Sequence, residues 1–175
     1  MDLSQINLNK VTFENCQFID CDFSESALNQ CKFIDCSFKN SNLSLAKLNN
    51  SLVNEVEFNA CKMTGVNWNQ ARWSNITLAS PIFFKACDVS LSSFYELKLP
   101  ELSMIDCKAH DVDFRGCDLT RADFTRTDFE KAEFMHTRLN HADFREAINY
   151  IINPVENSLT RAKFSFPEVV NLLRG

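Results

Sequence analysis

Apolar side chains recur at every fifth position along most of this 175-residue chain. A first series of these positions, which we call centres, consists of Leu3, Leu8, Phe13, Phe18, Phe23, Leu28, Phe33, Phe38, Leu43, Leu48, Val53, Phe58, Met63, Trp68, Trp73 and Leu78. A second series, displaced by one residue, consists of Phe84, Val89, Phe94, Leu99, Met104, Ala109, Phe114, Leu119, Phe124, Phe129, Phe134, Leu139 and Phe144. A period of five fits neither the 3.6-residue helix nor the two-residue strand, since either would send successive centres to different faces. The pattern therefore predicts a chain that turns a corner every five residues.

The residue two positions before most centres is small or compact, and all eight cysteines of the chain fall at this position. Cys16 and Cys21 are five residues apart, as are Cys31 and Cys36. This spacing matches no common zinc motif, and a shared inward position is typical of cysteines that act as small buried apolar residues. We therefore expect free thiols in the core, with no metal site and no cofactor.

Several of these units share one composition: a small residue, then Asp, then Leu or Phe. They are Cys21-Asp22-Phe23, Cys117-Asp118-Leu119, Ala122-Asp123-Phe124, Thr127-Asp128-Phe129 and Ala142-Asp143-Phe144. The chain thus resembles the pentapeptide-repeat family from about Met1 to Phe144. The resemblance implies an all-β fold, a right-handed quadrilateral β-helix with four repeats, or twenty residues, in each coil. It also implies that the centre and the residue two before it point inward, while the other three positions face water.

The shift between the two series falls within residues 79–84, next to Pro81. Either Phe83 or Phe84 fits the core there, so we expect a bulge, and the bond before Pro81 is a candidate for the cis form. The sequence shows no out-of-phase insertion long enough to form the projecting loops of many quinolone-resistance members of the family, so the chain most resembles the loopless members and the microcin-immunity proteins.

The repeats resume at Leu159 and Phe164 after an interruption at Asn149 and Pro154. We therefore expect a β-helix over residues 1–164 with a decorated last coil at 147–163. Residues 165–175 read as a short helix, with Pro167 early and Glu168 in the first turn. This helix is expected to cap the open end and, by resemblance, to dimerise through its apolar side chains, which are Phe166, Val169, Val170, Leu172 and Leu173.

The charge balance limits the possible functions. The chain has 18 basic and 23 acidic residues, a net charge of −5, which argues against direct binding of nucleic acid. The first residues lack an apolar targeting segment, and no apolar run is long enough to cross a bilayer, so we expect a cytoplasmic protein without membrane contact.

Catalysis has little support in the sequence. The three histidines, His110, His136 and His141, fall at outward positions, and no nucleophile is placed to work with them. The three glycines form no phosphate-binding loop. We therefore predict that the chain is not an enzyme and has no catalytic residues.

The outward positions remain for function, and their charge is unevenly distributed. Two adjacent faces of the C-terminal half collect seven acids, which are Asp88, Glu96, Asp111, Asp113, Asp128, Glu130 and Glu133. With three bases, Lys108, Arg115 and Lys131, these faces have a net charge of −4. The opposite wall contains Lys98, Arg121 and Arg138 and is net positive.

The N-terminal half instead has an amide-rich face, in which we expect side-chain hydrogen bonds between coils. Its members include Asn7, Asn29 and Asn49.

The resemblance gives the acidic faces one candidate role. The better-known bacterial members of the family resemble duplex DNA, dimerise through the C-terminal end, and bind DNA gyrase or topoisomerase IV, which they protect from quinolones or peptide toxins. The first hypothesis is therefore a homodimeric rod that binds a type II topoisomerase through the seven acids. The alternative is a general interaction scaffold with an unrelated partner, on which the acids serve solubility.

Overall fold

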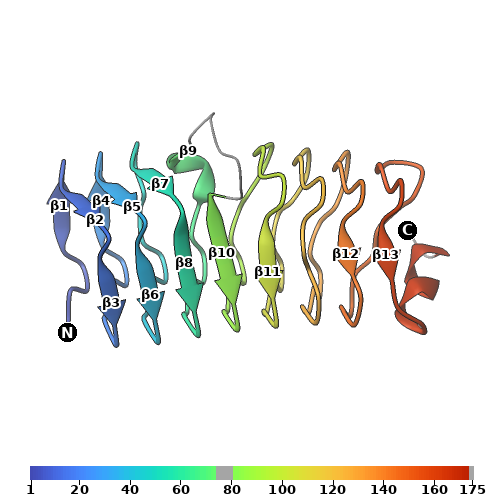
Figure 1. The fold of residues 1–175 in the computed structure, drawn as a ribbon, viewed down its shortest axis with the longest axis horizontal. Helices are drawn as coiled ribbons and strands as arrows, with labels where there is room; N and C mark the ends of the chain where they lie inside the picture. Colours follow the sequence, from blue (N-terminus) through green and yellow to red (C-terminus); the bar gives the residue numbers. More distant parts are fainter. Residues whose placement is uncertain (74–80, 174–175) are drawn as a thin grey trace.

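The chain folds into a right-handed, four-sided parallel β-helix of about eight coils. A computed structural model describes residues 1–73 and 81–173. The coils stack along one axis, and the two ends of the chain lie at opposite ends of the rod (Figure 1). This agrees with the fold that the five-residue pattern and the family resemblance predict.

The regular elements are short, because each side of the coil contains only one repeat. The strands are β1 (Asn7–Asn9), β2 (Thr12–Glu14), β3 (Gln17–Ile19), β4 (Ala27–Asn29), β5 (Lys32–Ile34), β6 (Ser37–Lys39), β7 (Leu52–Asn54), β8 (Val56–Asn59), β9 (Arg72–Trp73), β10 (Ile82–Lys85), β11 (Ser103–Ile105), β12 (Asp143–Phe144) and β13 (Lys163–Phe164). Within the described residues, two 3-10 helices, η1 (Trp68–Gln70) and η2 (Glu168–Leu173), complete the set.

The register between neighbouring coils is twenty residues. In β3, β6 and β8, Phe18 pairs with Phe38 and Phe38 pairs with Phe58, all in parallel. Backbone N–H groups donate to the next coil along the same ladder, as from Asp20 to the carbonyl of Lys39 at 3.0 Å. Each coil therefore satisfies the backbone polar groups of its neighbours, as in other solenoids.

We number the four sides of the rod by their centres. Face 1 contains Leu8, Leu28, Leu48, Trp68, Phe94, Phe114 and Phe134. Face 2 contains Phe13, Phe33, Val53, Trp73, Leu99, Leu119, Leu139 and Leu159. Face 3 contains Phe18, Phe38, Phe58, Phe84, Met104, Phe124, Phe144 and Phe164. Face 4 contains Leu3, Phe23, Leu43, Met63, Val89, Ala109 and Phe129.

The core is a set of columns of like side chains. Phe114 stacks on Phe94 and on Phe134, with ring centroids 5.2 Å apart in both pairs and the planes inclined by 12°. Phe114 and Phe124 have no exposed surface. Such stacking explains why the same residue type recurs every twenty positions, because a ring of one size fills the space that the ring above it leaves.

The corners explain the five-residue period. In most repeats one residue, at the corner, has a left-handed backbone, as at Asp111 (φ 53°) and Glu96 (φ 57°). Gly116 has φ 70° at such a corner, and an added Cβ there would lie 2.9 Å from Glu96 Cγ. A glycine therefore fits this corner better than the residue types found at most others.

The shift between the two series is larger than the sequence analysis predicts. Phe84 pairs with Phe58, twenty-six positions earlier, so the coil between them contains six residues more than the repeat needs. The expectation of a one-residue slip without a longer insertion is therefore wrong. Phe84, not Phe83, is the core residue. The centre expected at Leu78 and the bond before Pro81 involve residues 74–80, which lie outside the described residues.

The last coil keeps its twenty-residue register through an irregular segment. Phe164 pairs with Phe144 in β13 and β12, although Asn149 and Pro154 occupy positions where centres are due. Tyr150 and Ile152 fill the core instead, both without exposed surface. The buried Asn157 anchors the segment, since its Nδ2 donates to the carbonyls of Phe134 and Asn153 and its Oδ1 accepts from the N–H of Thr137.

The chain ends on η2, a 3-10 helix after a cis bond between Phe166 and Pro167. Leu172 of this helix packs against the core cluster. None of its side chains is fully buried. The helix lies at the far end of the rod, beyond β13 (Figure 1).

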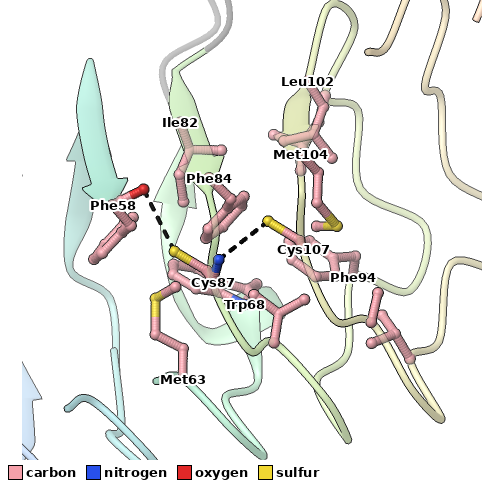
Figure 2. Packing of buried hydrophobic residues seen from close by; sticks show 14 of the residues in the cluster. Phe58, Met63, Trp68, Ile82, Phe84, Cys87, Phe94, Leu102, Met104 and Cys107 are labelled. Atoms are coloured by element: carbon pink, nitrogen blue, oxygen red, sulfur yellow. Dashed lines mark hydrogen bonds between the residues drawn. The ribbon is translucent and has the colours of Figure 1, made fainter. Parts of the chain in front are cut away.

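The cysteines are free and point inward, as expected. Three of them, Cys61, Cys87 and Cys107, stack in successive coils, where the N–H of Cys87 donates to Cys107 Sγ at 3.4 Å and Cys87 Sγ donates to the carbonyl of Phe58 (Figure 2). Hydrogen bonding to Cys107 raises the pKa of the Cys87 thiol to about 12. These thiols are packing groups and not exposed nucleophiles.

Candidate partner-binding surface

The seven acids lie on face 4, on face 1 and at the two corners that border face 1. Asp88, Asp128 and Glu130 are on face 4, and Asp113 and Glu133 are on face 1. Asp111 lies at the corner between these faces, and Glu96 lies at the corner between faces 1 and 2. Each acid is one or two positions from a buried centre, so the packed core fixes its backbone position.

On face 1, a single arginine bridges the acids of two coils. Arg115 lies 2.8 Å from Asp113 and 3.0 Å from Glu133. Its guanidinium also lies over the ring of Tyr95, 5.7 Å from the centroid. The hydrogen bonds from Arg115 lower the pKa of the Asp113 carboxyl. Arg115 is therefore held on three sides, and much of the negative charge beside it is compensated.

On face 4, a histidine contacts two acids of the next coil. His110 Nε2 lies 2.8 Å from Asp128 Oδ2, and Nδ1 lies 3.8 Å from Glu130. Burial raises the pKa of Asp128, but hydrogen bonds from Asn149 and His110 outweigh it, so the pKa is lowered overall. Lys108 lies 4.0 Å from Asp88, at the limit of an ion pair.

Two of the seven acids are in no ion pair within residues 1–73 and 81–173. They are Asp111 and Glu96, both exposed at corners. Hydrogen bonding to Glu96 raises the pKa of the neighbouring Tyr95 phenol. The acids that have no ion-pair partner thus lie at the two corners that border face 1.

The opposite wall, face 2 and its corner with face 3, is also compensated. Arg121 lies 2.7 Å from Glu101, and Arg138 lies 2.7 Å from Asp118, each base twenty residues after its acid. Lys98 is in no ion pair among the residues that the structure describes. Of the three bases predicted on this wall, only Lys98 therefore lacks an ion-pair partner among the described residues.

The N-terminal part of face 1 has amides in place of ion pairs. Asn29 Nδ2 donates to Asn7 Oδ1 at 3.0 Å, and Asn49 Nδ2 donates to Asn29 Oδ1 at 2.9 Å. The predicted hydrogen bonds between coils are therefore present.

The C-terminal end exposes a second apolar surface. Phe166 is 84% exposed, Leu173 is 85% exposed and Val170 is 43% exposed, whereas Val169 and Leu172 are half-buried. Only three of the five residues predicted for dimerisation are therefore open to a partner.

The sequence analysis missed the exposed apolar residues among the acids. Leu91, Tyr95 and Met135 lie beside Asp111, Arg115 and Glu133, at outward positions where the repeat sets no residue type. An apolar residue at an outward position was the available signal, since most outward positions are polar.

Within residues 1–73 and 81–173, neither a candidate metal site nor a membrane-spanning helix is found. No three His, Cys, Asp or Glu side chains there are grouped so as to hold a metal ion. A membrane-spanning helix, which needs both length and apolar character, is likewise not found in these segments.

Comparison with known proteins decides the family. A family profile described as "Pentapeptide repeat region" matches residues 11–81 and 82–148. The chain belongs to the pentapeptide-repeat family. A search of curated protein sequences finds no match.

Among solved structures, this pentapeptide-repeat chain is similar to full-length QnrB1, described as a plasmid-mediated fluoroquinolone resistance protein. The TM-score is 0.67 at 17% identity, over 99% of this chain and 95% of that one. A trypsin-treated form of QnrB1 matches with a TM-score of 0.58 at 18% identity, over 99% and 94% of the two chains. At this identity the likeness shows the fold, which is that of a repeat-protein scaffold.

Proposed function

We propose that this pentapeptide-repeat protein is a non-enzymatic rod whose acidic faces bind a bacterial type II topoisomerase, DNA gyrase or topoisomerase IV, and modulate or protect it. The observation that carries the proposal is the sided charge. Faces 4 and 1 of the C-terminal half, with their corners, have seven acids and three bases, while the opposite wall is slightly positive. QnrB1 is described as a fluoroquinolone resistance protein, and such resistance is consistent with a topoisomerase partner.

Local charge supports the proposal more than net charge does. Duplex DNA has one negative charge per ~1.7 Å of its axis. A rod with a total net charge of −5 has a much lower charge density along its axis. Asp111 and Glu96 nevertheless present unpaired carboxylates on either side of face 1. We propose that these two corners, with the ion-paired acids between and beside them, contact a basic surface of the enzyme.

The proposal includes a homodimer formed through the C-terminal end. Phe166, Val170 and Leu173 expose apolar surface there, which favours burial against a second copy. Leu172→Asp and Leu173→Asp test it by light scattering. The dimer predicts a halved mass for Leu173→Asp, and a monomeric mass for the unmodified protein contradicts it.

A supercoiling assay with DNA gyrase tests the partner. The protein at micromolar concentration is expected to change supercoiling, or to restore it in the presence of a quinolone or a peptide toxin. Asp111→Lys and Glu96→Lys should weaken the effect, because both acids are exposed and unpaired. Glu25→Lys, at a corner of the N-terminal half, is the matched control and should leave it unchanged. If the unmodified protein has no effect under any of these conditions, the proposal is wrong.

A second function has its own supporting observation. Most acids of the two faces have a partner within the chain, since Arg115, Lys108 and Lys131 form ion pairs with them and His110 lies within hydrogen-bond distance of Asp128. Such charges suit a general scaffold that stays soluble and binds an unrelated partner elsewhere. Recovery from a bacterial lysate of a partner that is not a topoisomerase, with binding insensitive to Asp111→Lys and Asp128→Lys, supports this alternative.

A further inference from the structure

The exposed apolar side chains of the rod gather on the same two faces as the acids. Within the described residues, faces 2 and 3 expose one large apolar side chain, Ile19. Faces 4 and 1 and the corner between them expose several, which are Leu45, Leu91, Tyr95, Met135 and Ile148. A surface that only imitates the phosphates of DNA has no use for apolar groups. The combination instead fits a partner that offers both cations and apolar side chains.

The centre of this surface is a row of three side chains on face 1. Tyr95, Arg115 and Met135 occupy equivalent positions in successive coils, as the bridges Ser93–Asp113 and Asp113–Glu133 define. Tyr95 is 44% exposed and Met135 is 40% exposed, with Arg115 between them. Tyrosine, arginine and methionine are the residue types enriched where proteins contact one another.

This row is held in place before any partner arrives. Arg115 is fixed by Asp113 at 2.8 Å, by Glu133 at 3.0 Å and by the ring of Tyr95. The backbone carbonyl of Tyr95 also accepts a hydrogen bond from the side-chain amide of Asn69. Side chains that are already ordered lose little conformational entropy on binding, so their contacts contribute more to affinity.

The spacing of the row suggests the form of the partner. Neighbouring coils lie about 4.8 Å apart, which is close to the ~5.4 Å pitch of an α-helix laid along the rod. Same-side residues of an extended strand are roughly 6.6 Å apart, which fits less well. The acids beside the row, Asp111, Asp113, Glu96 and Glu133, favour lysine or arginine on the flanks of such a helix.

We infer that the Tyr95–Arg115–Met135 row and its flanking acids bind a cationic amphipathic helix of a partner protein, which lies along the rod with its apolar side on the row. The inference rests on the proposed function, since it uses the same two faces, and it adds the chemistry of the segment that is recognised. It also assigns most of the affinity to the Tyr95–Arg115–Met135 row, and only the steering of the encounter to the acids.

Fluorescence anisotropy with a labelled synthetic peptide tests this inference. The probe is an eighteen-residue peptide of lysine and leucine at helical spacing, and its scrambled form is the charge-matched comparison. The unmodified protein is expected to bind the helical peptide at least tenfold more tightly than the scrambled one. Equal binding of the two peptides would show attraction by charge alone and would overturn the inference.

Variants locate the contact. Tyr95→Ser with Met135→Ser should weaken binding of the helical peptide at least tenfold, and Ile19→Ser, on face 3, should leave it unchanged. Leu91→Ser, at the exposed corner, is a second variant in case the double variant unfolds, and is expected to weaken binding about threefold. Unchanged binding by folded variants overturns the inference. So does a loss of self-association on light scattering in the double variant, because the occupant is then a second copy.

The two proposals fail separately. Peptide binding that follows these expectations, without any effect on gyrase, contradicts the proposed topoisomerase and leaves the row as a helix-binding surface. An effect on gyrase that Asp111→Lys abolishes but the double variant does not contradicts the row alone.

Discussion

The two halves of the rod have the same core but connect their coils by different chemistry. In residues 1–73, asparagine side chains join successive coils, and no ion pair lies within this described segment. From Asp88 onward, ion pairs join them, most with an acid in one coil and a base twenty residues later, as in Glu101–Arg121 and Asp118–Arg138. The repeat therefore determines how the coils stack, whereas the side chains at outward positions determine how the rod responds to pH, salt and partners.

The difference follows from residue type. The bases of residues 1–73 are lysines apart from Arg72, whereas six arginines lie between Arg115 and Arg161. A guanidinium fork matches a carboxylate in two places and reaches across a coil, while a lysine remains a mobile point charge. The C-terminal half therefore has an ordered charged surface, which suits it better to recognise a protein.

The largest effect should show what the halves have in common. Phe38→Ala and Phe114→Ala each remove a stacked ring that is almost fully buried, and each should cost about 3–5 kcal/mol of unfolding free energy. Urea unfolding followed by the fluorescence of Trp68 and Trp73 measures both. A loss below about 1 kcal/mol in one variant only would contradict a shared core.

Buried polar anchors should give the next largest effect. Ser51 Oγ accepts from the N–H of Cys31 at 2.8 Å, and Asn157 Oδ1 accepts from the N–H of Thr137 at 2.9 Å, on the same side of the rod. Ser51→Ala and Asn157→Ala each leave a buried N–H without its partner, at a cost of about 1–3 kcal/mol. Ser4→Ala, which is exposed, is the control. Unfolding curves like that of the unmodified protein would contradict these roles.

Acid should affect the C-terminal half first. Ionic and hydrogen-bonded partners lower the pKa of Asp113, Asp118 and Asp143 in the folded state. The unfolded state then binds more protons as the pH falls below about 4, so the stabilisation present above that pH is lost. Hydrogen exchange at pH 7 and pH 3 should show a larger loss of protection in residues 101–145 than in residues 21–60. An equal loss would contradict the difference between the halves.

The smallest effect concerns the amide ladder. Asn29→Ala breaks its hydrogen bonds with Asn7 and Asn49 at the surface and should cost about 0.5 kcal/mol, since water replaces both partners. The cost should not change between low and high salt. For Arg138→Met, which breaks the pair with Asp118, the effect should shrink as salt rises. Thermal unfolding at two salt concentrations measures both, and a salt-dependent Asn29→Ala would contradict a neutral ladder.

Much of the fold is predictable from the sequence because one rule sets every core position. For example, phenylalanine recurs every twenty residues at Phe94, Phe114 and Phe134. If each coil has four sides of five residues, these three rings must stack in one column. The coil at Trp73–Phe84 was mispredicted, because Leu78 happens to continue the first series and conceals six added residues. Tyr150 was missed for a related reason, since it fills the core one position after the centre due at Asn149.

The candidate surface is less predictable. The positions of the seven acids follow from the period, but their compensation depends on how far a side chain reaches to the next coil. The contacts of Arg115 with Asp113, Glu133 and Tyr95 join three coils, and no pattern along the chain identifies them. The alignment of Tyr95 and Met135 with Arg115 likewise appears only when the coils are stacked.

Hydrogen exchange of the full chain, alone and with DNA gyrase, tests the central claim most directly. The account predicts protection at residues 88–96, 110–116 and 128–136, which form faces 4 and 1 of the C-terminal half, with the amide ladder at Asn7, Asn29 and Asn49 unchanged. Protection confined to that ladder or to the wall of Arg121 and Arg138, or no protection at all, would contradict it.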